Sequence, residues 1–114
     1  MPSFAFTRRA ALAALGTTAV AASLPRAARA DDATVIIDNF AFVPAEMTVA
    51  AGTKVTFTNH DDIPHTVVGT QHPPAFRSPP LDNGESFSFT FATAGSFAYF
   101  CSLHPHMQGM IVVT

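Results

Sequence analysis

The chain has 114 residues, enough for one domain, with six basic and eight acidic residues. Four of the basic residues fall within the first thirty positions, which contain no acidic residue. Without those positions, Asp31–Thr114 has two basic residues, Lys54 and Arg77, against all eight acidic ones, a net charge of −6. Such a small acidic domain would be repelled by phosphates, which argues against nucleic acid and favours a positively charged protein partner.

Residues 1–30 have the pattern of a secretory signal peptide. A basic start precedes an apolar run from Ala10 to Leu24, and the segment closes with Ala28-Arg29-Ala30, an A-x-A cleavage site. A membrane anchor is the alternative, but an apolar run of about 15 residues is shorter than the ~20 that a spanning helix needs. We therefore predict cleavage after Ala30, a domain over residues 31–114, and no stable membrane insertion after cleavage.

The start of this segment indicates the export route. Thr7-Arg8-Arg9-Ala10-Ala11-Leu12 resembles the bacterial twin-arginine signal, which is read by a receptor and does not anchor the protein. General secretion is the alternative route. The twin-arginine route would mean export of an already folded protein, and we predict a periplasmic location.

The rest of the chain has the patterns of an all-β fold. Thr53–Thr58 alternates polar and apolar residues, and Phe87, Phe89 and Phe91 alternate with hydroxyl residues, as strands with one face on a core do. Phe40 and Phe42 alternate with small residues in the same way, whereas residues 70–84, with two Pro-Pro pairs, are irregular. With about seven short strands and no convincing helix after residue 30, we predict a small antiparallel Greek-key β-sandwich.

One loop concentrates side chains that bind transition metals. Cys101, His104 and Met107 have the spacing C-x2-H-x2-M between two hydrophobic strand segments. Thiolate, imidazole and thioether suit copper, whereas zinc is more often held by four Cys and His ligands. The only cysteine cannot form an internal disulfide, so metal ligation would explain it in an exported protein. A second imidazole must come from elsewhere, and His65, just after Pro64, is the best candidate.

These segments together resemble the cupredoxin family of small blue copper proteins. The resemblance rests on Pro64-His65-Thr66-Val67, on the stretch from Tyr99 to Gly109, on Asn59, and on the C-terminal Gly-x-Ile-Val-Val strand, and it extends over residues 33–114. The short loop is similar to that of the amicyanins, whereas plastocyanins and pseudoazurins have longer spacings between histidine and methionine.

The resemblance implies one type 1 copper ion per chain. His65, Cys101 and His104 would form the copper plane, and Met107 would be the weak axial ligand. It further implies a monomeric electron carrier that cycles between Cu(I) and Cu(II) and exchanges electrons with a redox protein, such as a c-type cytochrome or a dehydrogenase. The ring of His104 would be the electron port, and Asp61 and Asp62 could steer a basic partner.

Several nearby residues are not expected to bind the metal. Met110 is the alternative to Met107 as axial ligand, but it fits the pattern of the following strand. His106 could replace a ligand when the site opens, but we expect it to be an exposed loop residue, as we do for His60 and His72. The family often has Asn where this chain has Thr66, so we expect the hydrogen bonding between the two ligand loops to differ, with the backbone N–H of Thr66 still able to reach the thiolate.

Two other function classes are compatible with a copper site. A copper-delivery protein without an electron-transfer role is the main alternative, because the exposed loop contains a further histidine and position 66 is unusual. A copper enzyme would need a second copper centre, and a binuclear electron-entry centre needs two cysteines. The histidines other than the candidate ligands show no H-x-H pattern that could build a second copper centre, and the single cysteine excludes the binuclear one. We therefore predict that the protein is not an enzyme.

Overall fold

The structure is a computed structural model and describes residues 32–114; the predicted signal peptide and its cleavage site lie outside these residues. All regular elements in this range are strands, and within it no helix is long and apolar enough to cross a membrane. The strands are β1 (Asp32–Asp38), β2 (Ala41–Val43), β3 (Glu46–Val49), β4 (Thr53–Asn59), β5 (Val68–Gly69), β6 (Ser86–Phe91), β7 (Gly95–Phe100) and β8 (Gln108–Val113).

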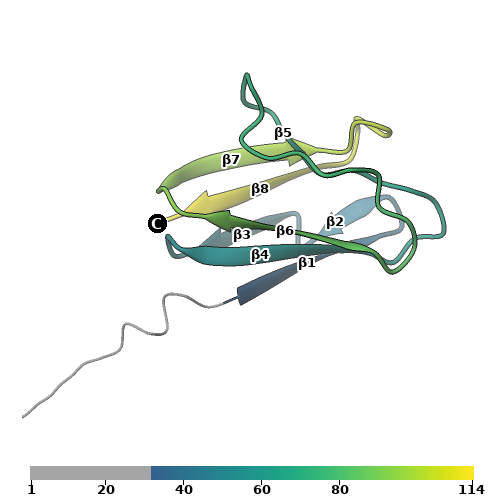
Figure 1. The fold of residues 1–114 in the computed structure, drawn as a ribbon, viewed down its shortest axis with the longest axis horizontal. Coiled ribbons are helices and arrows are strands. Elements are labelled where there is room, and N and C mark those ends of the chain that lie inside the picture. Colours follow the sequence, from purple (N-terminus) through teal and green to yellow (C-terminus); the bar gives the residue numbers. More distant parts are fainter. Residues whose placement is uncertain (1–31) are drawn as a thin grey trace, which may run out of the picture.

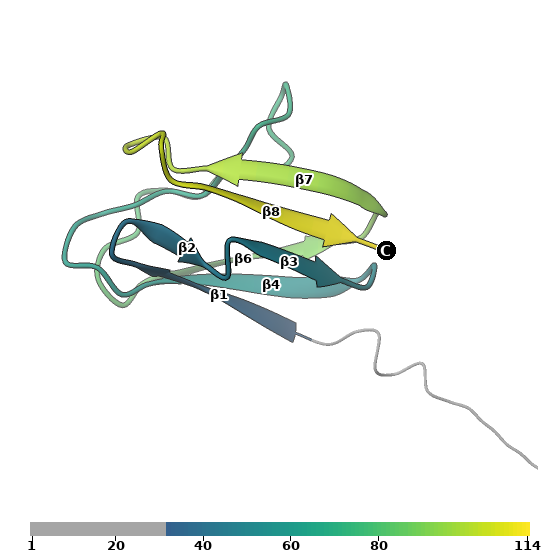
Figure 2. The same ribbon diagram turned by 180° about the vertical axis from the view of Figure 1, so that it is seen from behind.

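The strands form two four-stranded sheets packed face to face, in the orders β2-β1-β4-β6 and β3-β8-β7-β5 (Figures 1 and 2). The predicted all-β sandwich is confirmed, with eight strands where about seven were expected. Both sheets are mixed and not purely antiparallel, because β1 pairs in parallel with β4 and β3 with β8. The reason is that the chain crosses to the second sheet at β3 before it returns to the first sheet at β4. β4 therefore runs in the same direction as β1.

The core lies between the sheets and is rich in aromatic rings. Phe57 and Tyr99 come from opposite sheets, are both buried, and meet with ring centroids 5.3 Å apart. Phe91 is buried, and Phe87 and Phe89 are partly buried and pack on the same core, so the predicted aromatic face of this strand is confirmed. On the opposite face of the first sheet, hydroxyl pairs link β4 to β6, Thr56 with Ser88 and Thr58 with Ser86, each at 2.8 Å.

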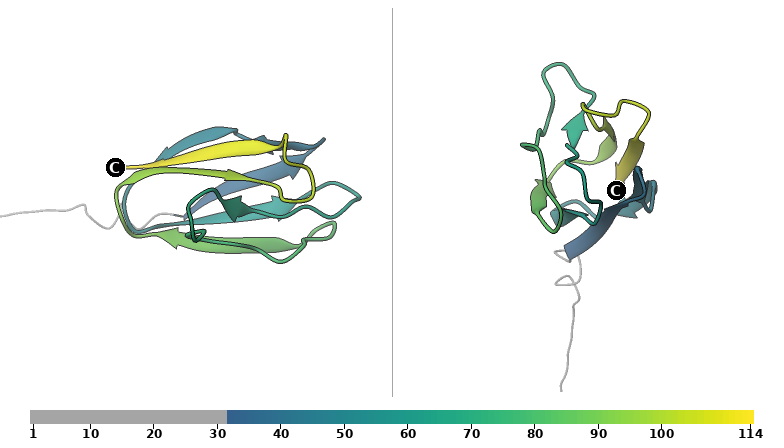
Figure 3. Two further views of the ribbon diagram at one scale, coloured as in Figure 1. Left: turned by 90° about the horizontal axis from the view of Figure 1, so that it is seen from above. Right: turned by 90° about the vertical axis from the view of Figure 1, so that its right-hand side faces the viewer.

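The two ends of the sandwich differ. β1 begins and β8 finishes at one end, where the backbone N–H of Ala51, in the turn between β3 and β4, donates to the carbonyl of Thr114 at 3.0 Å. β4 and β7 finish at the other end, and the long connections after them lie there (Figures 1 and 3). Residues 70–84 have no strand, only an isolated bridge to β5 and one at Leu81, as their composition predicts.

The connection between β1 and β2 departs from the prediction. Asn39 and Phe40 form a two-residue hairpin turn, and both have positive φ angles, 53° and 61°. Phe42 is buried as the alternation predicts, but Phe40 is 52% exposed at the end of the sandwich where β4 and β7 finish. Two positive φ angles match the twist of the flanking strands in a hairpin, so the turn geometry takes Phe40 out of the extended pattern.

Candidate metal centre

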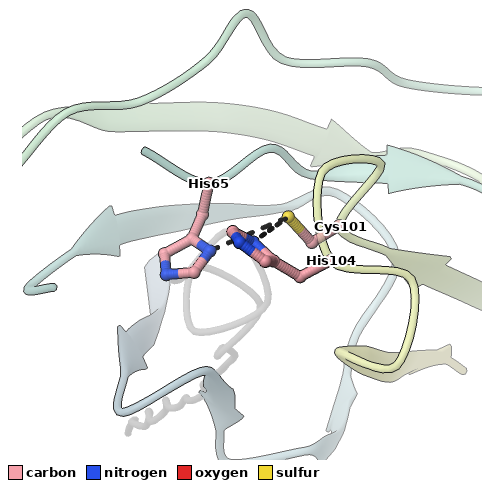
Figure 4. Close-up of side chains that lie close together, drawn as sticks. All are labelled: His65, Cys101 and His104. Carbon is pink, nitrogen blue, oxygen red and sulfur yellow. Dashed lines mark hydrogen bonds between the residues drawn. The ribbon is translucent and has the colours of Figure 1, made fainter. Parts of the chain in front are cut away.

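Three of the predicted ligands converge at one end of the sandwich (Figure 4). Cys101 directly follows β7, His104 lies in the loop between β7 and β8, and His65 lies before β5. The Sγ atom of Cys101 is 3.8 Å from Nδ1 of His65 and 3.7 Å from Nδ1 of His104. The three donor atoms lie within 4.8 Å of one another, and within residues 32–114 this is the one such group of His, Cys and acidic side chains.

The loop between β7 and β8 is closed by its own backbone. The N–H of Cys101 donates to the carbonyl of Met107 at 3.1 Å. The N–H of His104 donates to the carbonyl of Cys101 at 3.2 Å, and the N–H of Met107 donates to the carbonyl of His104 at 2.9 Å. The side chain of Met107 is buried at 4% exposure on the same loop, whereas Met110 is half-buried within β8 opposite Ala98. The loop therefore presents thiolate and imidazole from one compact turn, with the thioether of Met107 packed beneath the surface.

His65 is fixed by hydrogen bonds of its backbone and of its ring. Its backbone pairs with Leu81 through N–H to carbonyl bonds of 3.1 and 2.7 Å. Its Nε2 lies 2.8 Å from a carboxylate oxygen of Asp61. A carboxylate can only accept, so Nε2 carries the hydrogen and Nδ1 is left with its lone pair directed toward Cys101. This is the tautomer that a metal site needs.

Asp61 ties His65 to the β1–β2 turn. Its carboxylate also accepts the backbone N–H groups of Asn39 and Phe40 at 2.7 and 3.0 Å. Burial acts to raise the pKa of Asp61, but the hydrogen bonds from Phe40, Asn39 and His65 act against it, and the pKa is lowered. From the sequence, Asp61 was predicted only to steer a partner, and its contact with His65 was not predicted, although an acid four residues before a candidate ligand histidine is a signal for such a contact.

Asn59 builds the loop that places both Asp61 and His65. It is fully buried, and its Nδ2 donates to the carbonyls of Ile63 and Leu81 at 2.9 and 2.7 Å. Its Oδ1 accepts the N–H of Asp61 at 2.8 Å. One side chain thus satisfies two backbone groups of the loop after β4 and one of the segment between β5 and β6, which explains why an amide is needed at the end of β4.

Thr66 connects the two ligand loops. Its backbone N–H lies 3.3 Å from Sγ of Cys101, as predicted, and its hydroxyl lies 3.7 Å from the same sulfur. The hydroxyl also accepts the backbone N–H of Ser102 at 2.7 Å and lies 2.8 Å from its Oγ. The threonine hydroxyl therefore provides a bridge between the loops at the position where the family often has Asn.

The remaining histidines lie apart from this group. His60, His72 and His106 are exposed and do not belong to the donor cluster. His106 lies on the ligand loop itself, two residues after His104. That none of the three binds the metal stays a prediction.

The donors fit a single copper ion. Sγ of Cys101 lies 3.8 and 3.7 Å from the two imidazole nitrogens, separations that the usual nitrogen and sulfur ligand distances of roughly 2.0–2.3 Å can span through one ion. The buried thiol, two imidazoles and a buried thioether on the same loop form the soft donor set that favours copper. The fold and the site together define a small copper-binding β-sandwich protein.

Comparison with known proteins gives the family. The "Cupredoxin-like domain" family matches residues 10–113, and the chain belongs to the cupredoxins. Amicyanin from Paracoccus denitrificans is 32% identical over 114 residues, covering 91% of this chain and 87% of that protein. The structure of a purple cupredoxin from Nitrosopumilus maritimus is similar with a TM-score of 0.68 and 33% identity, covering 73% of this chain and all of that one. The cofactor of this chain is copper.

A similarity to part of an enzyme does not change this conclusion. The copper-containing nitrite reductase of Thermus scotoductus matches with a TM-score of 0.67 and 34% identity over 73% of this chain, but over only 22% of the reductase. The match is therefore to one section of a much longer chain. The chain belongs with the small cupredoxins, the amicyanins and plastocyanins that it matches over most of its length, and, as predicted, it is not an enzyme.

Proposed function

We propose that this protein is a type 1 blue copper electron carrier that shuttles single electrons between redox proteins in the periplasm. The observation that carries the proposal is the convergence of Sγ of Cys101 with Nδ1 of His65 and of His104, within 4.8 Å of one another at one end of a rigid sandwich. We assign His65, Cys101 and His104 to the copper plane and Met107 to the axial position.

The bound copper would supply a reversible one-electron couple. The contribution of the protein is to hold the donors still while the charge changes. His65 is anchored by Leu81 and Asp61, and Cys101 is anchored by Thr66 and by the closed loop. Because the donors have little freedom to move, a change of oxidation state requires little rearrangement, which is the condition for fast electron exchange.

The surface around His104 supports a docking role. The ring of His104 is half-buried, and exposed apolar side chains lie beside it: Phe40 contacts the ring and is 52% exposed, and Leu103 precedes it and is 48% exposed. The carboxylate of Asp61 is occupied by internal hydrogen bonds, whereas Asp62 is exposed. With the net charge of −6 of residues 31–114, the surface suits a basic redox protein with an apolar contact area, such as a c-type cytochrome.

The proposal is tested by loading residues 31–114 with copper and recording the absorption and paramagnetic-resonance spectra. We expect an intense blue or purple colour from thiolate-to-copper charge transfer and a reversible potential by voltammetry. Cys101→Ala should abolish the colour, and His106→Ala should leave it nearly unchanged. A colourless protein that passes Cu(I) to an acceptor would instead establish copper delivery, the alternative function.

The proposed location has a separate test. We propose that residues 1–30 direct export through the twin-arginine route and are cleaved after Ala30, on the basis of the Arg8-Arg9 pair, the apolar run and the A-x-A site. N-terminal sequencing of the protein from a periplasmic extract should begin at Asp31. Arg8→Lys combined with Arg9→Lys should block export by the twin-arginine route, whereas unchanged export would indicate general secretion.

A further inference from the structure

We infer that Phe40 is a positioning residue that holds the ring of His104 in its ligand orientation, and that the Asn39–Phe40 turn adopts a strained conformation to place it there. This inference rests on the proposed copper site and adds a residue from a third segment of the chain to it. The sequence pattern around Phe40 indicates only a short strand, so the role emerges from the geometry of the turn.

The two histidines are held in different ways. His65 has a hydrogen bond from Nε2 to Asp61 that fixes its ring. Within residues 32–114, the Nε2 atom of His104 has no such partner, and the only hydrogen-bond contact of its side chain is the 3.7 Å approach of Nδ1 to Cys101. The orientation of the His104 ring therefore depends on the rings packed against it.

Two rings pack against His104. The ring of His65 lies with its centroid 4.9 Å away at an interplanar angle of 63°. The ring of Phe40 meets His104 edge to face, with centroids 5.2 Å apart and an interplanar angle of 90°. It meets His65 in the same manner at 5.5 Å and 84°. A single phenyl ring thus contacts both proposed imidazole ligands, and edge-to-face packing is the arrangement that aromatic rings prefer.

The backbone of Phe40 is unfavourable for a side chain of this kind. Its φ of 61° lies in the left-handed region, at the second position of a two-residue turn where glycine is the usual residue. Bulky residues are rare in this region. The side chain is also half exposed, while Phe42 in the next strand already fills the core. Local stability would favour glycine at position 40, so the phenylalanine needs another explanation.

The same carboxylate that orients His65 also holds this turn. Asp61 accepts the N–H groups of Asn39 and Phe40 as well as Nε2–H of His65. It therefore orients one histidine directly and the other through the turn and the ring of Phe40. The β1–β2 turn is thus linked to both ligand loops through Asp61 and Phe40. Removing the phenyl ring should leave the His104 ring free to reorient, whereas the His65 ring stays fixed by Asp61.

The test uses two glycine substitutions in the same turn, introduced in the chain of residues 31–114. Phe40→Gly removes the ring and relieves the backbone strain, whereas Asn39→Gly relieves strain at the neighbouring position and keeps the ring. The readouts are the ring mobility of His104 by NMR relaxation in the metal-free protein, the Cu(I) affinity from competition with a chelator, and the copper hyperfine pattern of the oxidised protein.

We expect Phe40→Gly to raise the ring mobility of His104 and to leave the ring mobility of His65 unchanged. It should weaken Cu(I) binding about tenfold, as loss of a ligand-orienting contact does, and it should alter the copper hyperfine pattern. Asn39→Gly should match the wild type in all three measurements. If Phe40→Gly also matches the wild type, or if both variants change alike, Phe40 is only a turn residue and the inference is wrong. If Phe40→Gly does not fold, Phe40→Leu, which keeps apolar bulk without a ring, decides by the same criteria. The NMR readout requires no copper, so it separates this inference from the proposed function, which fails if the wild type itself binds no copper.

Discussion

Replacing Asp61 by Asn should destabilise the metal-free protein, because its carboxylate accepts three hydrogen bonds. The donors are the N–H groups of Asn39 and Phe40 at 2.7 and 3.0 Å and Nε2–H of His65 at 2.8 Å. In its better orientation the new amide keeps two of these bonds as neutral ones and turns its NH2 group toward the N–H of Asn39. In the other orientation the NH2 group would face two donors, the N–H of Phe40 and Nε2–H of His65.

The expected loss follows from these bonds. Hydrogen bonds to a charged acceptor contribute about 1.5–3 kcal/mol each and neutral ones about 0.5–1.5 kcal/mol. Since 13% of the Asp61 side chain is exposed to solvent, the lower values apply. Losing one bond costs about 1.5 kcal/mol, and each of the other two falls from about 1.5 to the typical neutral value of about 1 kcal/mol, so the free energy of unfolding drops by about 2–3 kcal/mol. For a domain of this size the corresponding fall in Tm is roughly 10–20 °C.

The effect should depend on pH in a defined direction. The pKa of Asp61 in the folded protein is lowered below its ordinary value of 3.8. Its ionised form therefore stabilises the fold fully above the ordinary value, and this contribution is lost as the pH falls through the lowered pKa. The difference between wild type and Asp61→Asn should be constant from about pH 5 to 7 and should shrink below about pH 4.

The assay is urea unfolding of the metal-free proteins at pH 7 and pH 3.5, followed by circular dichroism. Asp62→Asn is the matched control, because it removes the same charge from the next residue, whose exposed side chain makes no hydrogen bond within residues 32–114. Equal stability of wild type and Asp61→Asn at pH 7, or an equal loss in the control, would refute the reasoning.

Three further substitutions test other contacts of the site end. Thr66→Val removes the acceptor of the Ser102 N–H and the hydroxyl near the thiolate. Urea unfolding should show a loss of about 1–2 kcal/mol, and voltammetry should show a lower potential, because a donor dipole at the sulfur favours the reduced state. Thr66→Ser should keep both the stability and the potential of the wild type. Gly109→Ala should cost about 1–3 kcal/mol in the same unfolding assay, since an added Cβ would overlap the ring of Tyr99; an unchanged midpoint would contradict the packing. Tyr99→Phe should leave the midpoint equal or higher, because its buried hydroxyl has no hydrogen-bond partner within residues 32–114, and a clear loss of stability would reveal a partner for that hydroxyl.

The strands that sequence could predict are those with a strict two-residue period. Thr53–Thr58 and the Phe87–Phe91 alternation have one side chain per face at each step, so their inward faces follow directly. Pairing direction has no such signature. The parallel pairing of β1 with β4 arises because β3 joins the other sheet, and that choice depends on packing between distant segments.

The convergence of His65, Cys101 and His104 was predictable because their chemistry is concentrated in one short loop and one Pro-His step, and the structure brings these three side chains together. That they bind copper together with Met107 stays a prediction. The residues that orient them were not predictable in the same way. Asp61 reads as a surface acid and Phe40 as a strand residue, and their roles depend on a hairpin turn that lies far from the ligand loops in sequence.

Both ends of the domain lie at the end of the sandwich opposite the histidines. β1 begins there and Thr114 is held there by the turn between β3 and β4 (Figure 1). A surface linker attached to either end would therefore leave the face of His104 pointing outward. When the protein is immobilised on an electrode through Thr114, its proposed electron port should face the solution. Attachment through a cysteine introduced at Leu103 should turn the port toward the electrode surface and give faster electron exchange with the electrode.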